Sequence, residues 1–281
     1  MYRRRTLEAA RADRGDIEDC VGREPGRRGV EVAAVGVFDG LPGQRDQVGE
    51  EWFTEYARSQ RFRLAVDVDI AKAFVEPGAK VLEVGALPLL LNLALAREGF
   101  DTVGVDLDPS RFQNAIAEHG LDVVACNIET ERFPFADATF DAITFNEVLE
   151  HLRINPVHCL RETHRVLKPG GKLMLETPNL RSLVGVRNLV VRGRSYAQAN
   201  SVYDEFQKLE RLGHMGHARE YATGDVEDLL QRVGFRVDEL VFRQRQHGRL
   251  TELACRLFPP LRRAVSYIAT AQASNPRPNP L

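Results

Sequence analysis

Residues 80–109 read KVLEVGALPLLLNLALAREGFDTVGVDLDP, and this stretch decides the fold. Its two short apolar segments, 80–84 and 102–105, have the length and composition of buried strands. Between them, the apolar residues of 89–98 recur at helical spacing, and Gly99 ends that helix. A strand, a helix and a second strand in this order predict a parallel β-α-β unit with a right-handed crossover.

The same alternation continues along the chain after this unit. A helix is also expected before it, at 51–75. Short apolar strands such as 81–84 and 141–145 predict a sheet that is buried on both faces, with helices on each side. The further helices are expected at 109–119, 156–167, 223–233 and 249–258, and five further strands at 122–125, 141–145, 172–177, 235–241 and 264–271, which makes seven strands in all.

The composition is that of an ordinary globular protein. The chain has 281 residues, 43% of them hydrophobic and 28% charged, and a formal net charge of −2. A protein that binds nucleic-acid phosphates usually carries a basic excess, so no nucleic-acid partner is expected. No apolar run approaches the ~18 residues of a membrane span. The four cysteines lie far apart without a CxxC pair, which is typical of reduced thiols in a cytoplasmic protein.

The two ends of the chain differ from its middle. Residues 1–46 hold seven of the 22 glycines and show little periodicity, which indicates a weakly ordered leader or an over-long start of the reading frame. Prolines keep residues 274–281 out of helix and sheet, so a flexible tail is expected there. Residues 47–273 are expected to form one domain. Within it, 180–220 break the alternation and are predicted to be a lid or substrate insertion.

Polar or small residues stand at the carboxyl ends of four predicted strands. In open α/β sheets, ligands bind outside these ends, at the point where the strand order reverses. Asp106 follows the Gly85 turn by about 20 residues, a spacing suited to an acid that binds ribose hydroxyls. The set consists of Glu83 and Gly85, Asp106, Asn127, and Asn146 with Glu147.

With these residues in place, the stretch from about 80 to 180 resembles the class I S-adenosylmethionine-dependent methyltransferases. The resemblance implies a Rossmann-like, doubly wound seven-stranded sheet, mostly parallel with an antiparallel terminal hairpin, and S-adenosylmethionine as the cofactor. It weakens after 180 and returns at HAREYATGDVEDLLQRVGF (217–235). The segments that carry it are VLEVG (81–85), GVDLDP (104–109), CNIETERFPFADATFDAITFNEVLEHL (126–152) and RVLKPGGKLMLETPN (165–179).

The resemblance also implies a role for each residue at the strand ends. Gly85 lets the first turn pass close to the cofactor. Glu83 orders that turn, often through water toward the methionine end, and Asp106 accepts hydrogen bonds from both ribose hydroxyls.

The remaining cofactor residues follow in the same way. Ile128 packs on the adenine and offers its backbone N–H. Asn127 stands where the family often has Asp, and its amide oxygen can still accept from the adenine amino group. Asn146 and Glu147 lie beside the methyl group that is transferred.

One departure from the family pattern lies in the first turn. The family has glycines two and four places after Gly85, where this chain has Leu87 and Leu89. Three outcomes stay open: Pro88 reroutes the loop, the cofactor binds more weakly, or the pocket is inactive. The same departure argues against a nicotinamide dehydrogenase, which requires G-x-G-x-x-G for the pyrophosphate.

Histidines are the candidate bases for an oxygen acceptor, because their pKa lies near neutrality. His151, His214 and His217 are the candidates, together with Glu147. Glu147, Glu150 and His151 are spaced i, i+3 and i+4, and share one face if the segment is helical. A few related methyltransferases hold a divalent ion with such a cluster and a later histidine, but many have the cluster without metal. No metal is expected here.

These observations predict an S-adenosylmethionine-dependent methyltransferase in the cytoplasm that acts on a small molecule or a glycan precursor, through O-methylation. In the 180–220 insertion, arginines 187, 192, 194 and 219 either meet an anionic acceptor or are simply solvated. The alternative is a catalytically inactive binding or regulatory protein on the same fold, for which Leu87 and Leu89 are the evidence.

Overall fold

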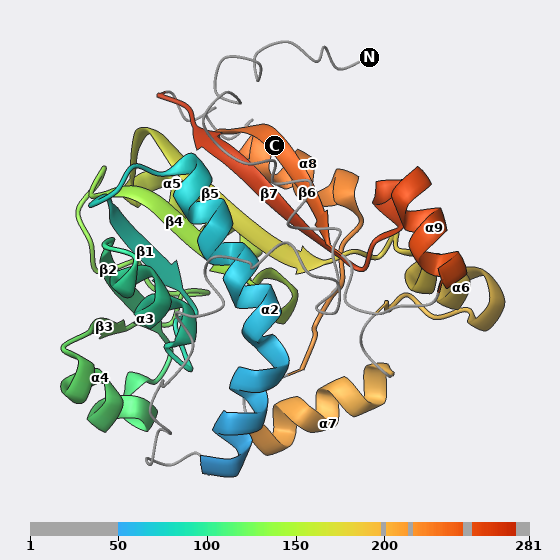
Figure 1. Ribbon diagram of the computed structural model, residues 1–281, viewed down its shortest axis with the longest axis horizontal. Helices are drawn as coiled ribbons and strands as arrows, with labels where there is room; N and C mark the ends of the chain where they lie inside the picture. The colour runs from blue at the N-terminus through green and yellow to red at the C-terminus, as the bar shows by residue number, and fades with distance from the viewer. Residues whose placement is uncertain (1–49, 198–200, 213–215, 244–248, 274–281) are drawn as a thin grey trace.

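The computed structural model describes residues 50–197, 201–212, 216–243 and 249–273. In these ranges the chain forms one seven-stranded sheet of order β3-β2-β1-β4-β5-β7-β6 (Figure 1). The predicted leader at 1–46 and the predicted tail at 274–281 lie outside the described residues. The strands are β1 (Lys80–Val84), β2 (Asp101–Asp106), β3 (Asp122–Ala125), β4 (Phe140–Asn146), β5 (Leu167–Pro178), β6 (Phe235–Arg243) and β7 (Ala264–Ala271).

Strand directions follow the expected pattern. β1 to β5 pair in parallel, whereas β7 runs antiparallel to both β5 and β6. The predicted fold class, a mostly parallel sheet that ends in an antiparallel pair, is therefore confirmed. The strand order reverses between β1 and β4, and this is where an open α/β sheet binds its ligands.

Helices cover both faces of the sheet (Figure 1). Ala142 of β4 belongs to the hydrophobic cluster under α2 and α3, whereas the next residue, Ile143, belongs to the cluster under α5 and α8. The helices are α2 (Glu50–Phe74), α3 (Leu90–Arg97), α4 (Gln113–His119), α5 (Pro156–Val166), α6 (Leu183–Arg192), α7 (Val202–Leu212), α8 (Thr223–Arg232) and α9 (Arg249–Leu257), with the short 3-10 helices η2 (Pro109–Phe112), η3 (Leu149–His151) and η4 (Pro259–Leu261). No helix in the described ranges combines the length and apolar composition that crossing a membrane requires.

Two features differ from the sequence-based expectation. The turn expected at 169–171 is a bulge inside β5: Phe140 pairs with Leu167 but Ala142 pairs with Lys172, so 168–171 lie outside the ladder. The 180–220 segment, for which no helix was predicted, contains α6 and α7. The residues that α6 buries are small or polar, so its apolar residues do not mark a face toward the core.

A cluster of four buried charges ties α2 to the sheet. Nη1 of Arg243 in β6 lies 2.6 Å from Oδ1 of Asp67 in α2 and 3.1 Å from Oε2 of Glu176 in β5. Arg63 of α2 completes the cluster, with its Nη1 3.4 Å from the same Glu176 oxygen. Burial raises the pKa of Asp67 to about 6, although the neighbouring Arg243 opposes this shift. Two cations and two anions balance one another here, away from water.

We expect Arg243→Met to destabilise the protein by about 3–5 kcal/mol, because it leaves a buried carboxylate without its cation. Urea unfolding of the full chain, followed by circular dichroism, measures this loss. Arg232→Met on α8 is the matched control, because the ion pair of Arg232 with Asp228 is exposed and worth less than about 1 kcal/mol. Equal losses in the two variants would contradict a structural role for the buried cluster.

Candidate functional site

The turn after β1 requires glycine at its first residue. Gly85 has a φ of 72°, and its N–H and that of Ala86 donate to the Val105 carbonyl at 2.9 and 3.2 Å. A Cβ at this position would lie 2.6 Å from Cγ2 of Val148. Gly85 is therefore fixed both by its left-handed backbone and by the close approach of the segment that follows β4.

Leu89, in the same turn, has a backbone conformation that usually belongs to glycine. Its φ is 69°, and its side chain is fully buried at the start of α3. A left-handed residue therefore stands where the family pattern has a glycine, and burial of the leucine side chain offsets the strain. Leu87 keeps its side chain at the wall of the cavity that this turn borders.

A cavity of about 90 Å³ lies between α2, the turn after β1 and the end of β4. Glu83 is buried there, and Oε2 of its carboxylate has no hydrogen-bond partner within the described part of the chain. Burial, with the nearby Asp106 carboxylate, holds the pKa of Glu83 well above its ordinary value. A buried polar atom left unpaired in this way is typical of a ligand or water site. The polar and small residues of the wall are Tyr56, Arg63, Glu83, Gly85, Asn146 and Glu147.

Sequence reasoning missed Arg63 and Tyr56, which α2 contributes to this cavity. Burial alone would lower the pKa of Arg63, but the carboxylates of Glu176 and Asp67 outweigh it and hold that pKa above its ordinary value. A charged pair at i and i+4 inside the apolar stretch of α2 was the available signal. Arg63 gives the cavity a permanent positive charge opposite the buried Glu83.

Asp106 and Asn127 stand at neighbouring strand ends. Oδ2 of Asp106 accepts the Leu87 N–H at 3.0 Å, so the carboxylate spans from the end of β2 to the turn after β1. The Asn127 side-chain oxygen accepts the N–H of Glu129 at 3.2 Å, and Ile128 packs against the core. The side chains that the sequence assigned to ribose and adenine therefore lie along one edge of the sheet.

The segment from Glu147 to His151 is not one helix, so the condition for a shared helical face of Glu147, Glu150 and His151 is not met. Glu147 has a φ of 55° and its N–H donates to the Glu176 carbonyl at 2.8 Å, so it precedes η3 and does not belong to it. This left-handed turn places Glu147 outside η3, although its carboxylate still interacts with that of Glu150. Glu147 lines the cavity, whereas Glu150 is fully buried and is not part of the cavity wall.

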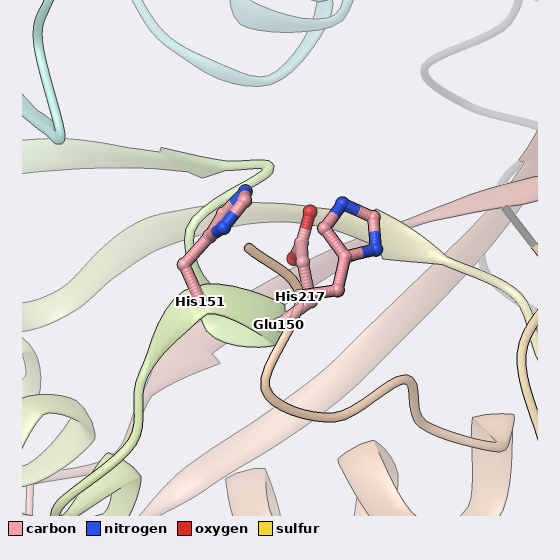
Figure 2. Close-up of side chains that lie close together, drawn as sticks. All are labelled: Glu150, His151 and His217. Carbon is pink, nitrogen blue, oxygen red and sulfur yellow. The ribbon is translucent and has the colours of Figure 1, made fainter. Parts of the chain in front are cut away.

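Glu150 and His151 instead form a cluster with His217, as Figure 2 shows. One ligand atom of each residue lies within 4.8 Å of the others, and the two imidazole rings meet edge to face at 4.9 Å. Oε2 of Glu150 accepts the Thr177 hydroxyl at 2.9 Å, while its Oε1 has no hydrogen-bond partner among the described residues. Burial, reinforced by the Glu147 carboxylate, raises the pKa of Glu150 well above its ordinary value.

Hydrogen bonds at Nδ1 orient both rings. Nδ1 of His151 lies 3.0 Å from the Gly216 carbonyl, and Nδ1 of His217 lies 3.3 Å from Oε1 of Glu220. These oxygens accept, so each Nδ1 carries a proton and Nε2 is the basic nitrogen of the neutral ring. Two imidazoles and a carboxylate arranged in this way suit either proton transfer or a divalent cation.

α7 and the segment after it hold His217 in place. Ala218 N–H donates to the Glu150 carbonyl at 2.8 Å, and His217 N–H donates to the buried Glu205 carboxylate of α7 at 2.9 Å. A Cβ on Gly216 would lie 2.2 Å from the Glu205 carbonyl oxygen, so this approach requires glycine. The structure thus brings His217 to His151, whereas His214 lies outside the described residues.

The four arginines of the predicted insertion lie in two places. Arg187 and Arg192 are exposed on α6, and Arg194 is exposed just after it. Arg219 lies over the Tyr221 ring at 5.0 Å, in the segment that holds His217. Arg219 alone of the four follows directly on the histidine cluster in sequence.

Comparisons with known proteins agree with this geometry. Residues 82–175 match the family model described as "Methyltransferase domain". A ubiquinone biosynthesis O-methyltransferase of Xanthomonas axonopodis pv. citri is 37% identical over 120 residues, which cover 41% of this chain and 49% of the relative. The chain therefore spans about half the length of the curated relatives that it matches first.

Solved structures share the fold at low identity. A SAM-dependent methyltransferase from Thermotoga maritima superposes with a TM-score of 0.52 at 17% identity, covering 79% of this chain and 96% of that one. The cyclase SpnF also superposes with a TM-score of 0.52, at 16% identity and with 76% and 84% of the chains covered. At these identities the likeness shows the fold alone. Residues 82–175 thus match a methyltransferase domain, for which S-adenosylmethionine is the implied cofactor, and the sheet has the fold of solved structures described as SAM-dependent methyltransferases.

Proposed function

We propose that this chain transfers the methyl group of S-adenosylmethionine to an oxygen atom of a small-molecule acceptor. The observation that carries the proposal is the cavity lined by Glu83, Gly85 and Asn146, within the stretch that matches the methyltransferase domain. The relatives named as O-methyltransferases support oxygen as the acceptor atom. A glycan precursor stays among the acceptors to be tested.

The residues around the cavity fit the charges of the cofactor. S-adenosylmethionine ends in an amino acid. The guanidinium of Arg63 offers a positive charge for its carboxylate, and the buried Glu83, whose raised pKa favours the neutral carboxyl, offers an oxygen that accepts from its ammonium group. A volume of about 90 Å³ is smaller than the ~300 Å³ of ordinary ligand pockets. We therefore assign only the methionine end to the cavity. In this assignment, Asp106 holds the ribose, and Asn127 and Ile128 hold the adenine, on the open edge formed by β2 and β3.

The histidine cluster supplies the acceptor side of the proposed reaction. When bound, S-adenosylmethionine supplies a methyl group on a sulfonium centre, which is already activated, so alignment of the acceptor oxygen carries much of the rate. Asn146 and Glu147 orient the acceptor at the cavity. Nε2 of His151 or His217 takes the proton of the acceptor hydroxyl, and Glu220 stabilises the resulting positive charge on His217.

A divalent ion at the same cluster is a second candidate for this step. The observation that favours it is the convergence of Glu150, His151 and His217 within 4.8 Å, with an unpaired oxygen on the buried Glu150. Such an ion would activate the acceptor hydroxyl as a Lewis acid, without protonation of an imidazole.

The alternative function is a non-catalytic protein that uses the fold for binding or regulation. The Leu87 side chain at the cavity wall favours this alternative, because the side chain lies where a cofactor usually meets bare backbone. Calorimetric titration of the full chain with S-adenosylmethionine decides between the two: no heat of binding excludes the methyltransferase.

We expect Asp106→Ala to weaken S-adenosylmethionine binding by about 1.5–3 kcal/mol, the range for hydrogen bonds to a charged group. Isothermal titration calorimetry measures the change in Kd. Asp108→Ala is the matched control, because it removes a carboxylate from the same loop that accepts from Ser110 instead. An unchanged Kd in Asp106→Ala would disprove the ribose assignment.

If His151 or His217 is the catalytic base, its replacement by alanine should lower turnover by roughly 10²–10⁴-fold and leave cofactor affinity unchanged. The neutral ring is the active form, so we expect methylation to fall at acid pH, where an imidazole is protonated. Formation of S-adenosylhomocysteine with a panel of phenolic and sugar acceptors is the readout. His158→Ala on α5 is the control, because His158 contacts the Glu131 carbonyl away from the cluster.

The same assay separates the base from the metal. If an imidazole is the base, dialysis against a chelator leaves turnover unchanged. If a divalent ion activates the acceptor, dialysis abolishes turnover and addition of Mg²⁺ or Zn²⁺ restores it. Full turnover in both alanine variants, without any metal effect, would mean that alignment alone accelerates the reaction.

Glu220→Gln distinguishes His217 from His151 as the base. The variant keeps an acceptor for Nδ1 but removes the negative charge that stabilises the imidazolium of His217, so we expect slower turnover. Glu118→Gln, which replaces an exposed carboxylate on α4, is the control. Unchanged turnover in Glu220→Gln would leave His151 as the base.

A further inference from the structure

Helix α6 buries small or polar residues and exposes large apolar ones, which is the reverse of the usual pattern for a helix packed on a sheet. The residues that it and its N-cap bury are Ser182, Gly185 and Asn188, which are small or polar. Val190 and Val191 are 77% and 75% exposed, although both are aliphatic. The exposed large apolar residues of α6 are Leu183, Val186, Leu189, Val190 and Val191.

This orientation is fixed by contacts on the buried side. The Ser182 hydroxyl caps the helix by accepting the Gly185 N–H at 3.1 Å, and the Asn188 amide donates to the Tyr196 carbonyl at 2.9 Å. A Cβ on Gly185 would lie 2.0 Å from the Leu180 carbonyl oxygen. The helix therefore cannot roll its aliphatic residues inward without losing these contacts.

A second exposed apolar group lies on α9. Leu253 and Leu257 are one helical turn apart, Leu257 is 78% exposed, and Phe258 follows it. The segment that precedes α6 is joined to the segment that follows α9, because the Asn179 amide donates to the Pro260 and Arg262 carbonyls at 2.9 and 2.8 Å. Both helices lie at the edge where β5 ends and β7 begins, as Figure 1 shows. We call the exposed residues of the two helices the α6–α9 face.

The charge of this face indicates what it contacts. Residues 179–197 contain four arginines and no Asp or Glu, in a chain whose formal net charge is −2. Arg187 and Arg192 are exposed beside the valines of α6, and Arg256 is exposed beside the leucines of α9. A second copy docked on the same face by a two-fold axis would bring like charges together. Aliphatic residues with interspersed arginines instead complement an anionic lipid surface.

We propose that the α6–α9 face docks on the surface of a bilayer that contains anionic lipids. The aliphatic side chains enter the boundary between headgroups and acyl chains, and the arginines contact lipid phosphates. The helices lie on the membrane and do not cross it, in keeping with the absence of a spanning helix from the described ranges. The proposal does not depend on methyl transfer, and its test needs no acceptor.

Flotation of the full chain with vesicles tests the proposal. We expect binding to vesicles of phosphatidylcholine mixed with phosphatidylglycerol, weaker binding to phosphatidylcholine alone, and a decrease as salt is raised. The double variant Val190→Gln/Val191→Gln should lose about tenfold or more in affinity, because two apolar side chains no longer leave water. Arg192→Gln should lose about fivefold, the effect of one cation at an anionic surface.

Two control variants replace an exposed aliphatic residue and an exposed arginine outside the α6–α9 face. Ile154→Gln replaces an exposed aliphatic residue outside both helices, and Arg161→Gln replaces an exposed arginine on α5. Both should bind like the unmodified chain. Circular dichroism melting verifies that every variant is folded, which is expected because all five altered positions, in α6, in α5 and at residue 154, are exposed.

Three results would overturn the proposal. The first is that the full chain does not float with anionic vesicles. The second is equal loss of binding in the α6 variants and in the controls. The third is a concentration-dependent dimer in light scattering that the Val190→Gln/Val191→Gln variant abolishes while vesicle binding is absent, which would assign the face to a second copy of the chain.

Discussion

The buried ion cluster of Asp67, Arg243, Glu176 and Arg63 is the interaction on which the arrangement of the site depends. It joins α2, β5 and β6, three elements that are far apart in the sequence. Each charge is tolerated away from water only because the opposite charges lie within hydrogen-bonding or near-contact distance. Arg63 belongs to the cluster and also lines the cavity, so the forces that dock α2 on the sheet also set the charge of the cavity wall.

β5 connects the ion cluster to the candidate catalytic residues. Successive side chains of a strand point to opposite faces, so Glu176 reaches the ion cluster while Thr177 donates to Glu150 on the other side. The Glu176 carbonyl also accepts the N–H of Glu147 and fixes the left-handed turn there. Two adjacent residues of β5 thus fix Glu147 at the cavity wall and Glu150 in the histidine cluster. A change in the strand register would move both together.

The sequence predicted the sheet well because its strands are short apolar runs bounded by glycine, proline and charged residues. β1, β3 and β7 coincide with the ranges read from the sequence. Local sequence patterns did not predict the structure where tertiary contacts determine the conformation. A shared helical face of Glu147 and Glu150 is prevented by a backbone turn at Glu147, whose N–H donates to the Glu176 carbonyl. α6 was missed because the residues that it buries, Gly185 and Asn188, are not apolar. The role of Arg63 could not be read locally, since Glu176 lies more than a hundred residues away.

The leucines of the first turn bear on how such a site holds its cofactor. Leu89 keeps the left-handed backbone of a glycine position, and its buried side chain fills the space under α2. A dinucleotide needs bare backbone N–H groups around its pyrophosphate, whereas S-adenosylmethionine carries no phosphate and has charges only at its amino-acid end and its sulfur. Under the proposed function, the guanidinium of Arg63 and the carboxylate of Glu83 supply that complementarity from side chains. An apolar turn then weakens cofactor binding little, because side chains of α2 and β1, and not the loop backbone, supply the electrostatic recognition.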